Sequence, residues 1–363
     1  MEAKAVKTGE KAVGYGNNHS FTSLGKIEFE RRPVGAEDVG IDILYCGVCH
    51  SDIHQTANDW SNTIYPCVPG HEIVGKVTAV GSEVRNFSVG EIVAVGCMVD
   101  SCGVCVNCRE DLEQYCEGPK GATQTYNGPF IPDGTNTFGG YSDKIVVKEH
   151  FVLKVPENLD VKAVAPILCA GVTTYSPLKH WKVGEGQKVG VIGLGGLGHM
   201  GVKLAKALGA DVTVFSTSEE KEADAKTFGA TDFVLWEDTD AMEKLELTYD
   251  FLLDTIPYEH DINPFVKLLK RDATIAVVGL LLPFSKSTNN LEVAFHRRNL
   301  AGSLIGGIAE TQEVLDFCGE HNILPEVEMI AMEDINDAHK RVKKGEVRYR
   351  YVIDVAKTLS TDE

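Results

Sequence analysis

A glycine-rich turn between two apolar runs constrains this chain more than any other feature. Residues 188–192 are mostly β-branched and predict a strand, and residues 199–208 place apolar side chains at helical spacing. Gly193 would permit a tight turn, Gly195 would let a pyrophosphate approach the backbone, and Gly198 would let helix and strand pack closely. Helix-start N–H groups attract phosphates, so the turn predicts a dinucleotide site, although glycines also mark ordinary turns. The whole turn is Gly193, Leu194, Gly195, Gly196, Leu197 and Gly198.

Strands and helices alternate around this turn, from about residue 161 to residue 306. The other expected strands are 211–215, 232–235, 250–254, 273–279 and 299–305, and the other expected helices are 163–178, 219–228 and 262–270. Elements of these lengths in this order predict an α/β fold with a doubly wound parallel sheet, a Rossmann dinucleotide-binding domain over residues 161–306.

The residues before this region have a different character. Short apolar runs broken by glycine, proline and asparagine predict strands 39–45, 73–80, 91–95 and 144–147. No long helical pattern interrupts them, so residues 1–160 are expected to form a barrel-like or partly open β-rich domain. The tail, residues 307–363, is too short to be a domain and is expected to fold back onto the first one. It contains predicted helices at 311–320 and 335–343 and a predicted strand at 348–353.

The composition fits two globular domains. The chain has 363 residues, more than one usual domain, with 43% hydrophobic and 24% charged residues. A formal net charge of −18 argues against a nucleic-acid partner, which needs a basic surface. No apolar run reaches the length of a membrane span, and residues 1–7 show no signal-peptide core. We therefore expect a cytoplasmic protein with no membrane or nucleic-acid partner.

Ten cysteines in a reducing compartment indicate metal ligands rather than disulfides. Within a lobe at about 97–120, the spacing C-x2-C-x2-C-x7-C is formed by Cys102, Cys105, Cys108 and Cys116. Four thiolates close a tetrahedral shell around zinc and leave no place for a substrate, so we expect a structural zinc ion. An iron–sulfur cluster would use similar ligands, although its bacterial pattern ends with a proline where Glu117 stands. Disulfides or inert thiols would also account for cysteines at this spacing.

Three further potential ligands stand near glycines and turns: Cys49, His71 and Cys169. Two sulfurs and an imidazole with an open fourth position is how zinc is held when it must polarise a substrate oxygen. These residues are scattered over 120 positions, so spacing alone does not establish a site. The alternative for Cys169 is an ordinary packed cysteine.

The order of these motifs resembles that of zinc-dependent medium-chain alcohol dehydrogenases. The matching stretches are Cys-His-Ser-Asp-Ile-His at 49–54, Gly-His-Glu at 70–72, the clustered cysteines, Leu-Cys-Ala-Gly-Val-Thr at 168–173 and the glycine turn. Residues 109–116, 175–178, 198–201 and 348–351 are typical of the cinnamyl-alcohol-dehydrogenase branch and its microbial broad-range aldehyde reductases. The resemblance covers nearly the whole chain. It implies that the β-rich domain is a GroES-like catalytic domain.

The resemblance also implies roles for the scattered ligands. Cys49, His71 and Cys169 would bind the catalytic zinc ion, and Glu72 would join or displace ligands during turnover. Asp52 would orient a ligand histidine through its other nitrogen, the alternative being an ordinary turn aspartate.

A proton path is implied by the same resemblance. Ser51 would hydrogen-bond the substrate oxygen and begin a path through the cofactor ribose to His54. A histidine suits the outer end because its pKa lies near neutrality, the alternative being a surface histidine in a polar turn. His50 would face the cofactor pyrophosphate.

The tip of the second Rossmann strand indicates which dinucleotide binds. NAD sites usually place an acid there, whereas this chain has Ser216, Thr217 and Ser218, with Lys221 shortly after. Hydroxyls and a cation suit a 2′-phosphate, and the related family has matching residues around that phosphate, so we expect NADP(H). The alternative is that Ser218 only caps the next helix. By resemblance, the nicotinamide half would be lined by Thr173, Gly279, Ser303 and Ile305.

These features predict an oxidoreductase that interconverts aldehydes and primary alcohols with NADP(H) and two zinc ions per chain, mainly as an aldehyde reductase. The small-molecule substrates would be cinnamyl-type, benzylic or aliphatic. One alternative is a reductase of conjugated C=C or iminium bonds, although such relatives often lack the zinc ligands or the Ser51 and His54 pattern. Another is a non-catalytic NADPH-binding protein, which would lack catalytic ligands. By resemblance we expect a homodimer, in which the strand at 299–305 would pair with its copy.

Overall fold

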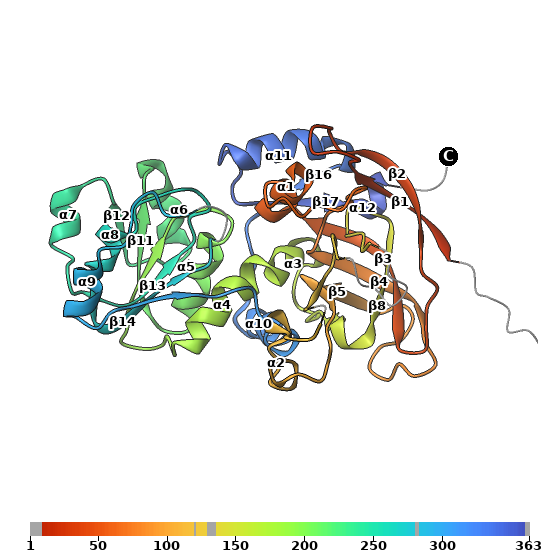
Figure 1. Ribbon diagram of the computed structural model, residues 1–363, viewed down its shortest axis with the longest axis horizontal. Coiled ribbons are helices and arrows are strands. Elements are labelled where there is room, and N and C mark those ends of the chain that lie inside the picture. Colours follow the sequence, from red (N-terminus) through yellow and green to blue (C-terminus); the bar gives the residue numbers. More distant parts are fainter. Residues whose placement is uncertain (1–8, 120, 129–135, 280–282, 360–363) are drawn as a thin grey trace, which may run out of the picture. The chain divides into compact units, whose positions relative to one another are not determined.

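The computed structural model describes residues 9–119, 121–128, 136–279 and 283–359 (Figure 1). Contacts divide these residues into two compact units. The first unit contains the chain up to Cys169 and again from Gly307, and the second unit contains Ala170–Gly306. The tail therefore belongs to the first unit, and the Rossmann region is inserted between its two parts.

The described residues of the first unit form an open sheet of seven strands. Six of them lie in the order β16 (Val327–Ile330), β17 (Arg350–Asp354), β3 (Asp38–Gly47), β4 (Ile73–Val80), β5 (Ile92–Val95) and β9 (Leu153–Lys154), and β8 (Lys144–Lys148) pairs with β3. The central strand β3 buries Val39, Ile41 and Ile43. Strand β17 comes from the tail and pairs antiparallel with β3, with Val352 opposite Gly47. The tail thus completes the first sheet.

Two smaller sheets of two antiparallel strands accompany this sheet. They pair β1 (Glu10–Gly16) with β2 (Gly25–Arg31), and β6 (Met98–Asp100) with β7 (Thr123–Gln124). The hairpin β1–β2 is absent from the predicted strands. Its second strand alternates apolar residues with charged ones and is only half-buried, which makes the apolar signal weak.

The helices of the first unit are short, apart from one in the tail. Helix α1 (His50–Ala57) ends at Asn58, whose φ of 61° lies in the left-handed region. The predicted tail helices correspond to α10 (Ile308–His321) and α11 (Ile335–Lys343). The remaining elements are α2 (Val106–Arg109), η1 (Glu113–Tyr115), η2 (Glu149–Phe151), α3 (Val161–Val164), η3 (Ala165–Leu168), η5 (Met332–Asp334) and α12 (Val355–Thr358).

The predicted boundary at 160/161 differs from the division seen in the structure. Residues 161–169 belong to the first unit, because α3 contacts β4 and β17 while η3 contacts β3, β4, β5 and β17. The predicted helix 163–178 is accordingly interrupted at Cys169, after which α4 (Ala170–His180) opens the second unit.

The described part of the second unit contains a sheet of six parallel strands. Their order is β12 (Asp232–Leu235), β11 (Asp211–Ser216), β10 (Lys188–Ile192), β13 (Tyr249–Asp254), β14 (Leu269–Val277) and β15 (Asn299–Gly302). Numbered along the chain, this is the order 3-2-1-4-5-6 of a doubly wound dinucleotide fold, as predicted. Phe215, Tyr249, Leu252 and Phe265 pack together in its core.

The helices of this unit agree less closely with the expected ranges. They are α4, α5 (Gly198–Ala207), η4 (Glu219–Lys221), α6 (Glu222–Thr227), α7 (Thr239–Glu243), α8 (Asn263–Val266) and α9 (Asn290–Phe295). The predicted helix 262–270 shrinks to α8, because Leu269 already pairs with Tyr249 at the start of β14. Among the described residues no single helix has the length and composition of a membrane span, and only the bent pair 161–168 with 170–180 passes on those two criteria.

Candidate active site

The chain enters helix α1 at Cys49, and this cap holds the first predicted ligand in place. Cys49 is the N-cap residue with φ −118° and ψ 156°, and its backbone N–H donates to Asp52 Oδ2 at 2.8 Å. An acid three residues after the cap that accepts from the cap N–H is one half of a capping box. The helix start therefore positions both the Cys49 sulfur and the Asp52 carboxylate.

Asp52 is fully buried and accepts hydrogen bonds on both oxygens. Its Oδ1 lies 3.1 Å from the N–H of Gly70 and 3.1 Å from Nδ1 of His71, and its Oδ2 accepts from the Tyr141 hydroxyl at 3.3 Å. Gly70 has φ +104°, and a Cβ there would lie 2.7 Å from the Tyr141 ring. When Nδ1 of the neutral His71 ring donates to Asp52, the lone pair of Nε2 is available to a metal ion.

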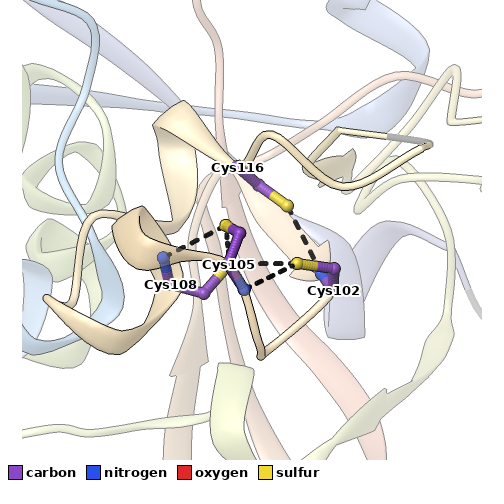
Figure 2. A group of neighbouring side chains, drawn as sticks. All are labelled: Cys102, Cys105, Cys108 and Cys116. Atoms are coloured by element: carbon purple, nitrogen blue, oxygen red, sulfur yellow. Dashed lines mark hydrogen bonds between the residues drawn. The ribbon is translucent and has the colours of Figure 1, made fainter.

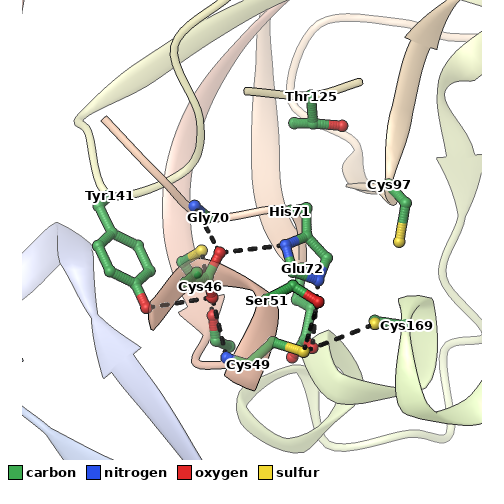
Figure 3. A network of polar contacts seen from close by, with 12 residues as sticks. Cys46, Cys49, Ser51, Gly70, His71, Glu72, Cys97, Thr125, Tyr141 and Cys169 are labelled. Atoms are coloured by element: carbon green, nitrogen blue, oxygen red, sulfur yellow. Dashed lines mark hydrogen bonds and ion pairs between the residues drawn. The ribbon is translucent and has the colours of Figure 1, made fainter. Parts of the chain in front are cut away.

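The four residues predicted to surround the catalytic zinc come together in the first unit (Figure 3). One donor atom from each of Cys49, His71, Glu72 and Cys169 lies within 4.8 Å of the others, and all four residues are buried. The two sulfurs are 3.9 Å apart, and His71 Nε2 lies 3.9 Å from Glu72 Oε1. This grouping differs from the alternative for Cys169, an ordinary cysteine packed among apolar side chains.

The contact between the two sulfurs moves their pKa values apart. The thiol of Cys169 lowers the pKa of Cys49 well below its ordinary value, although burial acts in the opposite direction. Hydrogen bonding to Cys49 in turn raises the pKa of Cys169 well above that value. Two buried thiols this close become thiolates together only when a cation replaces the proton between them.

Glu72 completes the group and supplies a test of whether a metal ion fits it. Its Oε1 is ion-paired with Arg350 of β17, while its Oε2 is buried without a hydrogen-bond partner among the described residues. Burial raises the pKa of Glu72 to about 7, although Arg350 acts to lower it. A buried carboxylate oxygen without a donor, beside two thiols and an imidazole, is satisfied by a divalent cation. The donor set therefore fits zinc.

Ser51 and His54 lie three residues apart on α1 and thus share one face of the helix. The Ser51 hydroxyl lies 3.7 Å from the Cys49 sulfur, beside the donor group. His54 Nδ1 lies 2.6 Å from an oxygen of Asp59, which leaves Nε2 for another partner, and the His54 ring stacks on Trp60. The His54 side chain is partly exposed, so a proton can pass between it and solvent.

His50 stands at the first position of α1. Its Nε2 is buried and has no hydrogen-bond partner within the described ranges. Burial lowers the pKa of His50 to about 4, so the ring is neutral at physiological pH. A neutral imidazole with a free nitrogen can hydrogen-bond a polar ligand group, and its contact with the cofactor pyrophosphate stays a prediction.

The other four predicted ligands form a second cluster in a lobe of the first unit (Figure 2). Their sulfurs all lie within 4.8 Å of one another. Cys108 Sγ is 3.8 Å from Cys102 Sγ and 3.5 Å from Cys105 Sγ. All ten cysteines of the chain fall within the described residues and are free thiols, so the disulfide alternative is not realised.

Backbone N–H groups point at the sulfurs of this lobe. Cys105 N donates to Cys102 Sγ at 3.3 Å, Cys108 N donates to Cys105 Sγ at 3.5 Å, and Gly118 N donates to Cys116 Sγ at 3.4 Å. Donation from the Cys108 N–H lowers the pKa of Cys105 to about 6. Such donors favour the thiolate, which is the form that binds a metal ion.

In the second unit the glycine turn joins β10 to α5, as predicted. Gly193 has φ +89°, and its N–H donates to the carbonyl of Phe215 at 2.8 Å. A Cβ at Gly198 would lie 2.1 Å from the Gly193 carbonyl oxygen, so helix and strand approach more closely than a larger residue allows. A Cβ at Gly195 would meet nothing within 4 Å, which leaves this backbone open to a phosphate.

The tip of β11 carries hydroxyl groups and no acid. Ser216 ends the strand, and its Oγ accepts from the N–H of Ser218 at 3.1 Å, while Thr217 between them is exposed. Ser218 precedes η4 but makes no side-chain capping hydrogen bond, so the capping alternative is not realised. Lys221 Nζ donates to the carbonyl of Leu194 at 3.0 Å, which brings its charge to the glycine turn.

The residues predicted for the nicotinamide half follow the carboxyl ends of strands, except Thr173. Thr173 lies in α4, and its buried hydroxyl oxygen has no partner in the part of the chain that the structure describes. Gly279 follows β14, and a Cβ there would lie 2.1 Å from the Ile256 carbonyl oxygen. Ser303 and Ile305 follow β15, and Ile305 holds a φ of +38° that is unfavourable for a β-branched residue. Doubly wound folds bind their ligands at this edge of the sheet.

Four side chains in these sites were not predicted from the sequence: Asp59, Tyr141, His339 and Arg350. Asp59 stands five residues after His54, so an acid near a proposed relay histidine was the available signal. The contacts of the others are long-range: 89 residues separate Tyr141 from Asp52, and 278 separate Arg350 from Glu72. No local pattern predicts such pairs.

Family models match both units. The model for the alcohol dehydrogenase GroES-like domain matches residues 35–157, and the model for zinc-binding dehydrogenase matches residues 196–320. Aldehyde reductase YahK of Escherichia coli is 50% identical over 332 residues, which are 91% of this chain and 94% of that protein. NADP-dependent alcohol dehydrogenase C 1 of Mycolicibacterium smegmatis is 50% identical over 351 residues, covering 95% of this chain and 98% of that protein.

Solved structures agree with these relatives. A cinnamyl alcohol dehydrogenase of Sorghum bicolor superposes with a TM-score of 0.93 and 41% identity over 98% of this chain and 100% of that one. The CAD of Helicobacter pylori, solved in complex with NADP(H), gives a TM-score of 0.88 and 42% identity over 96% and 99%. Identity and coverage of this extent confirm the resemblance: the chain belongs to the zinc-dependent alcohol dehydrogenase family, in its cinnamyl-alcohol-dehydrogenase-like branch.

Proposed function

We propose that this chain interconverts aldehydes and primary alcohols with NADP(H), mainly by aldehyde reduction. The observation that carries this proposal is the buried group of two thiols, an imidazole and a carboxylate within 4.8 Å of one another. Relatives named as an aldehyde reductase and an NADP-dependent alcohol dehydrogenase, each 50% identical, support the reaction class. The substrates are cinnamyl-type, benzylic or aliphatic.

Two zinc ions serve different purposes in this proposal. The catalytic ion is held by Cys49, His71 and Cys169 with Glu72 beside them, and the lobe cysteines hold a structural ion with no position left for substrate. The match to zinc-binding dehydrogenases favours zinc over an iron–sulfur cluster. Bound zinc supplies a Lewis acid for the carbonyl oxygen, and NADPH supplies the hydride.

The residues of α1 orient the substrate and move the proton. The Ser51 hydroxyl, next to the Cys49 sulfur, hydrogen-bonds the substrate oxygen. His54 is oriented by Asp59 and reaches solvent, so it replaces the proton that the product alcohol takes up. Asp52 keeps His71 in the tautomer whose Nε2 is free.

The second unit holds the cofactor. The glycine turn binds the pyrophosphate, and Thr173, Gly279, Ser303 and Ile305 line the nicotinamide half. Ser216, Thr217, Ser218 and Lys221 bind the 2′-phosphate. The choice of NADP(H) over NAD(H) is supported by the serine at position 216, where NAD sites usually have an acid. The NADP(H) complex of the related Helicobacter pylori enzyme also supports it.

The first test is Cys49→Ser. We expect turnover to be abolished and the catalytic zinc ion to be lost, because a hydroxyl is a far weaker zinc ligand than a thiolate, while NADPH still binds. Zinc content, NADPH fluorescence titration and steady-state rates with aliphatic and aromatic aldehydes would be measured. Normal turnover by a folded, zinc-depleted variant would refute the proposal.

The same assays separate the competing functions. With cinnamaldehyde, the proposed enzyme yields cinnamyl alcohol, whereas a reductase of conjugated double bonds yields the saturated aldehyde. A non-catalytic NADPH-binding protein turns over neither. Product analysis therefore decides among the three.

We also infer that the enzyme is a cytoplasmic homodimer. Ten free cysteines suit a reducing compartment. Strand β15 is the edge strand of its sheet, and exposed apolar side chains stand on it and on the neighbouring segments. These side chains are Leu291, Phe295, Leu300 and Leu304.

A further inference from the structure

A hydrogen-bonded chain of buried side chains leads from the metal donor His71 to helix α11. His71 Nδ1 lies 3.1 Å from Asp52 Oδ1, the Tyr141 hydroxyl lies 3.3 Å from Asp52 Oδ2, and Nε2 of His339 lies 3.4 Å from that hydroxyl. The Tyr141 hydroxyl is directed into the polar network around the donor group (Figure 3). All four side chains are buried, with Asp52 and Tyr141 at 0% exposure.

One arrangement of protons satisfies every contact of this chain. Burial lowers the pKa of His339 to about 4 and raises the pKa of Tyr141 well above its ordinary value, so both groups are neutral near pH 7. The Asp52 carboxylate can only accept hydrogen bonds, so the Tyr141 hydroxyl donates its proton to Asp52. The Tyr141 oxygen must then accept from Nε2–H of His339. The tautomers of both histidines are thus set through one carboxylate.

The geometry also shows why a hydroxyl, and not merely a ring, stands at position 141. A phenylalanine would fill the same volume, whereas a buried hydroxyl needs partners to offset its desolvation. Its partners are His339 and the carboxylate that contacts His71. The Tyr141 ring also lies against Gly70, where an added Cβ would come within 2.7 Å of it, so ring and hydroxyl flank the same ligand.

We propose that Tyr141 and His339 are positioning residues that act through Asp52 to hold His71 on the catalytic zinc ion. The inference rests on the proposed zinc site. The hydroxyl anchors Asp52 Oδ2, so that Oδ1 stays aligned with His71 Nδ1, and His339 keeps the hydroxyl turned toward Asp52. Without this anchor the imidazole gains rotational freedom, and the ion leaves more easily.

Tyr141→Phe tests the inference, because it removes one oxygen and leaves the ring. The zinc-loaded enzyme is mixed with excess 4-(2-pyridylazo)resorcinol, and zinc release is followed by absorbance. Cys49→Ser identifies the catalytic-site phase by its loss, and the lobe phase serves as an internal reference. We expect Tyr141→Phe to release the catalytic ion about 10-fold faster with the lobe phase unchanged, the lower end of the range for ligand-orienting partners. Tyr249→Phe, which removes a buried hydroxyl in the second unit, should change neither phase.

Two substitutions of His339 test the inference independently, one that removes the N–H donor and one that keeps it. His339→Leu removes the donor and should accelerate catalytic-site release, whereas His339→Gln retains an N–H donor and should stay within about twofold of the wild type. The visible spectrum of the cobalt-loaded enzyme should change in Tyr141→Phe and His339→Leu and not in His339→Gln.

Two results would overturn the inference. One is catalytic-site release at the wild-type rate in both Tyr141→Phe and His339→Leu. The other is equal acceleration of both release phases, which would indicate a general loss of stability. Failure of the proposed function looks different, since the wild-type enzyme itself would then hold no zinc at the Cys49 site.

Discussion

At the scale of single residues, Lys221 is the side chain proposed to select the cofactor. It follows the β11 tip, where hydroxyl groups replace the acid that NAD sites use, and its ammonium already reaches the glycine turn at Leu194. The neighbouring acids, Glu219 and Glu220, are exposed. In the proposed function, phosphate recognition at this tip depends on the charge of Lys221 and the nearby hydroxyls.

We expect Lys221→Glu to lower kcat/KM for NADPH about 10- to 100-fold, because a charge-assisted hydrogen bond contributes about 1.5–3 kcal/mol. The value for NADH should change by less than about threefold, since NADH lacks the phosphate. Steady-state kinetics with both coenzymes measure the ratio. Lys226→Glu, the same charge change in the exposed ion pair with Glu222, is the matched control. An unchanged ratio in Lys221→Glu would exclude this phosphate contact.

At the scale of elements, Glu113 ties the lobe that carries the four clustered cysteines to helix α10. This buried side chain in η1 contacts Nε2 of His150 at 2.7 Å with one oxygen and accepts from the N–H of Ile308 at 3.0 Å with the other. Burial would raise the pKa of Glu113, but His150 and the Ile308 N–H lower it overall. Donation to Glu113 raises the pKa of His150.

These shifts predict a pH window for the contact. The stability that the ionised Glu113 carboxylate contributes is fully present above the ordinary carboxyl pKa of 4.5. It is lost as pH falls through the lowered pKa of Glu113. The stability that the protonated His150 ring contributes is fully present below the ordinary histidine pKa of 6.5. It is lost as pH rises through the raised pKa of His150. We expect His150→Gln to lower Tm by about 1–2 °C between those values, since His150 is largely exposed, and by less at alkaline pH. Thermal unfolding across pH measures this. A Tm difference that grows toward alkaline pH would contradict it, and the exposed His321→Gln is the control.

Elements with a strong local signal could be predicted from the sequence, and those set by distant contacts could not. The glycine turn with its flanking strand and helix is local, because Gly193 and Gly198 fulfil backbone requirements within a few residues. The start of β14 is not local, since Leu269 becomes a strand residue by pairing with Tyr249. The hairpin β1–β2 was missed for a related reason, as its half-exposed residues lack a continuous apolar run.

At the scale of the whole molecule, the proposed dimer makes a direct prediction. Leu300→Glu places a charge on the exposed edge of β15 and should convert the dimer into single chains, because a buried unpaired carboxylate is costly. Sedimentation velocity measures the change. Val89→Glu, at an exposed apolar position of the first unit, should leave the dimer intact. A wild-type protein that sediments as a single chain would contradict the dimer, and a dimeric Leu300→Glu would contradict this interface.

The parts of the candidate site differ in how well the sequence predicts them. The lobe cysteines share one short segment, so their spacing alone indicated a metal. Cys49, His71 and Cys169 required the family resemblance, because only the folded first unit brings them together. The partners behind them, Arg350 and His339, come from the tail and meet their targets through tertiary packing.

The pairing of β17 with β3 has a consequence for how the molecule is made. The ribosome delivers Cys49, His71 and Glu72 before the inserted unit, whereas Arg350, whose guanidinium faces Glu72, is translated after it. The inserted unit, whose strands all lie between its own ends, can assemble while synthesis continues. We therefore expect the order of maturation to be reversed relative to the order of translation: the inserted unit is finished first, and the part of the chain before it waits for the residues that follow the insertion.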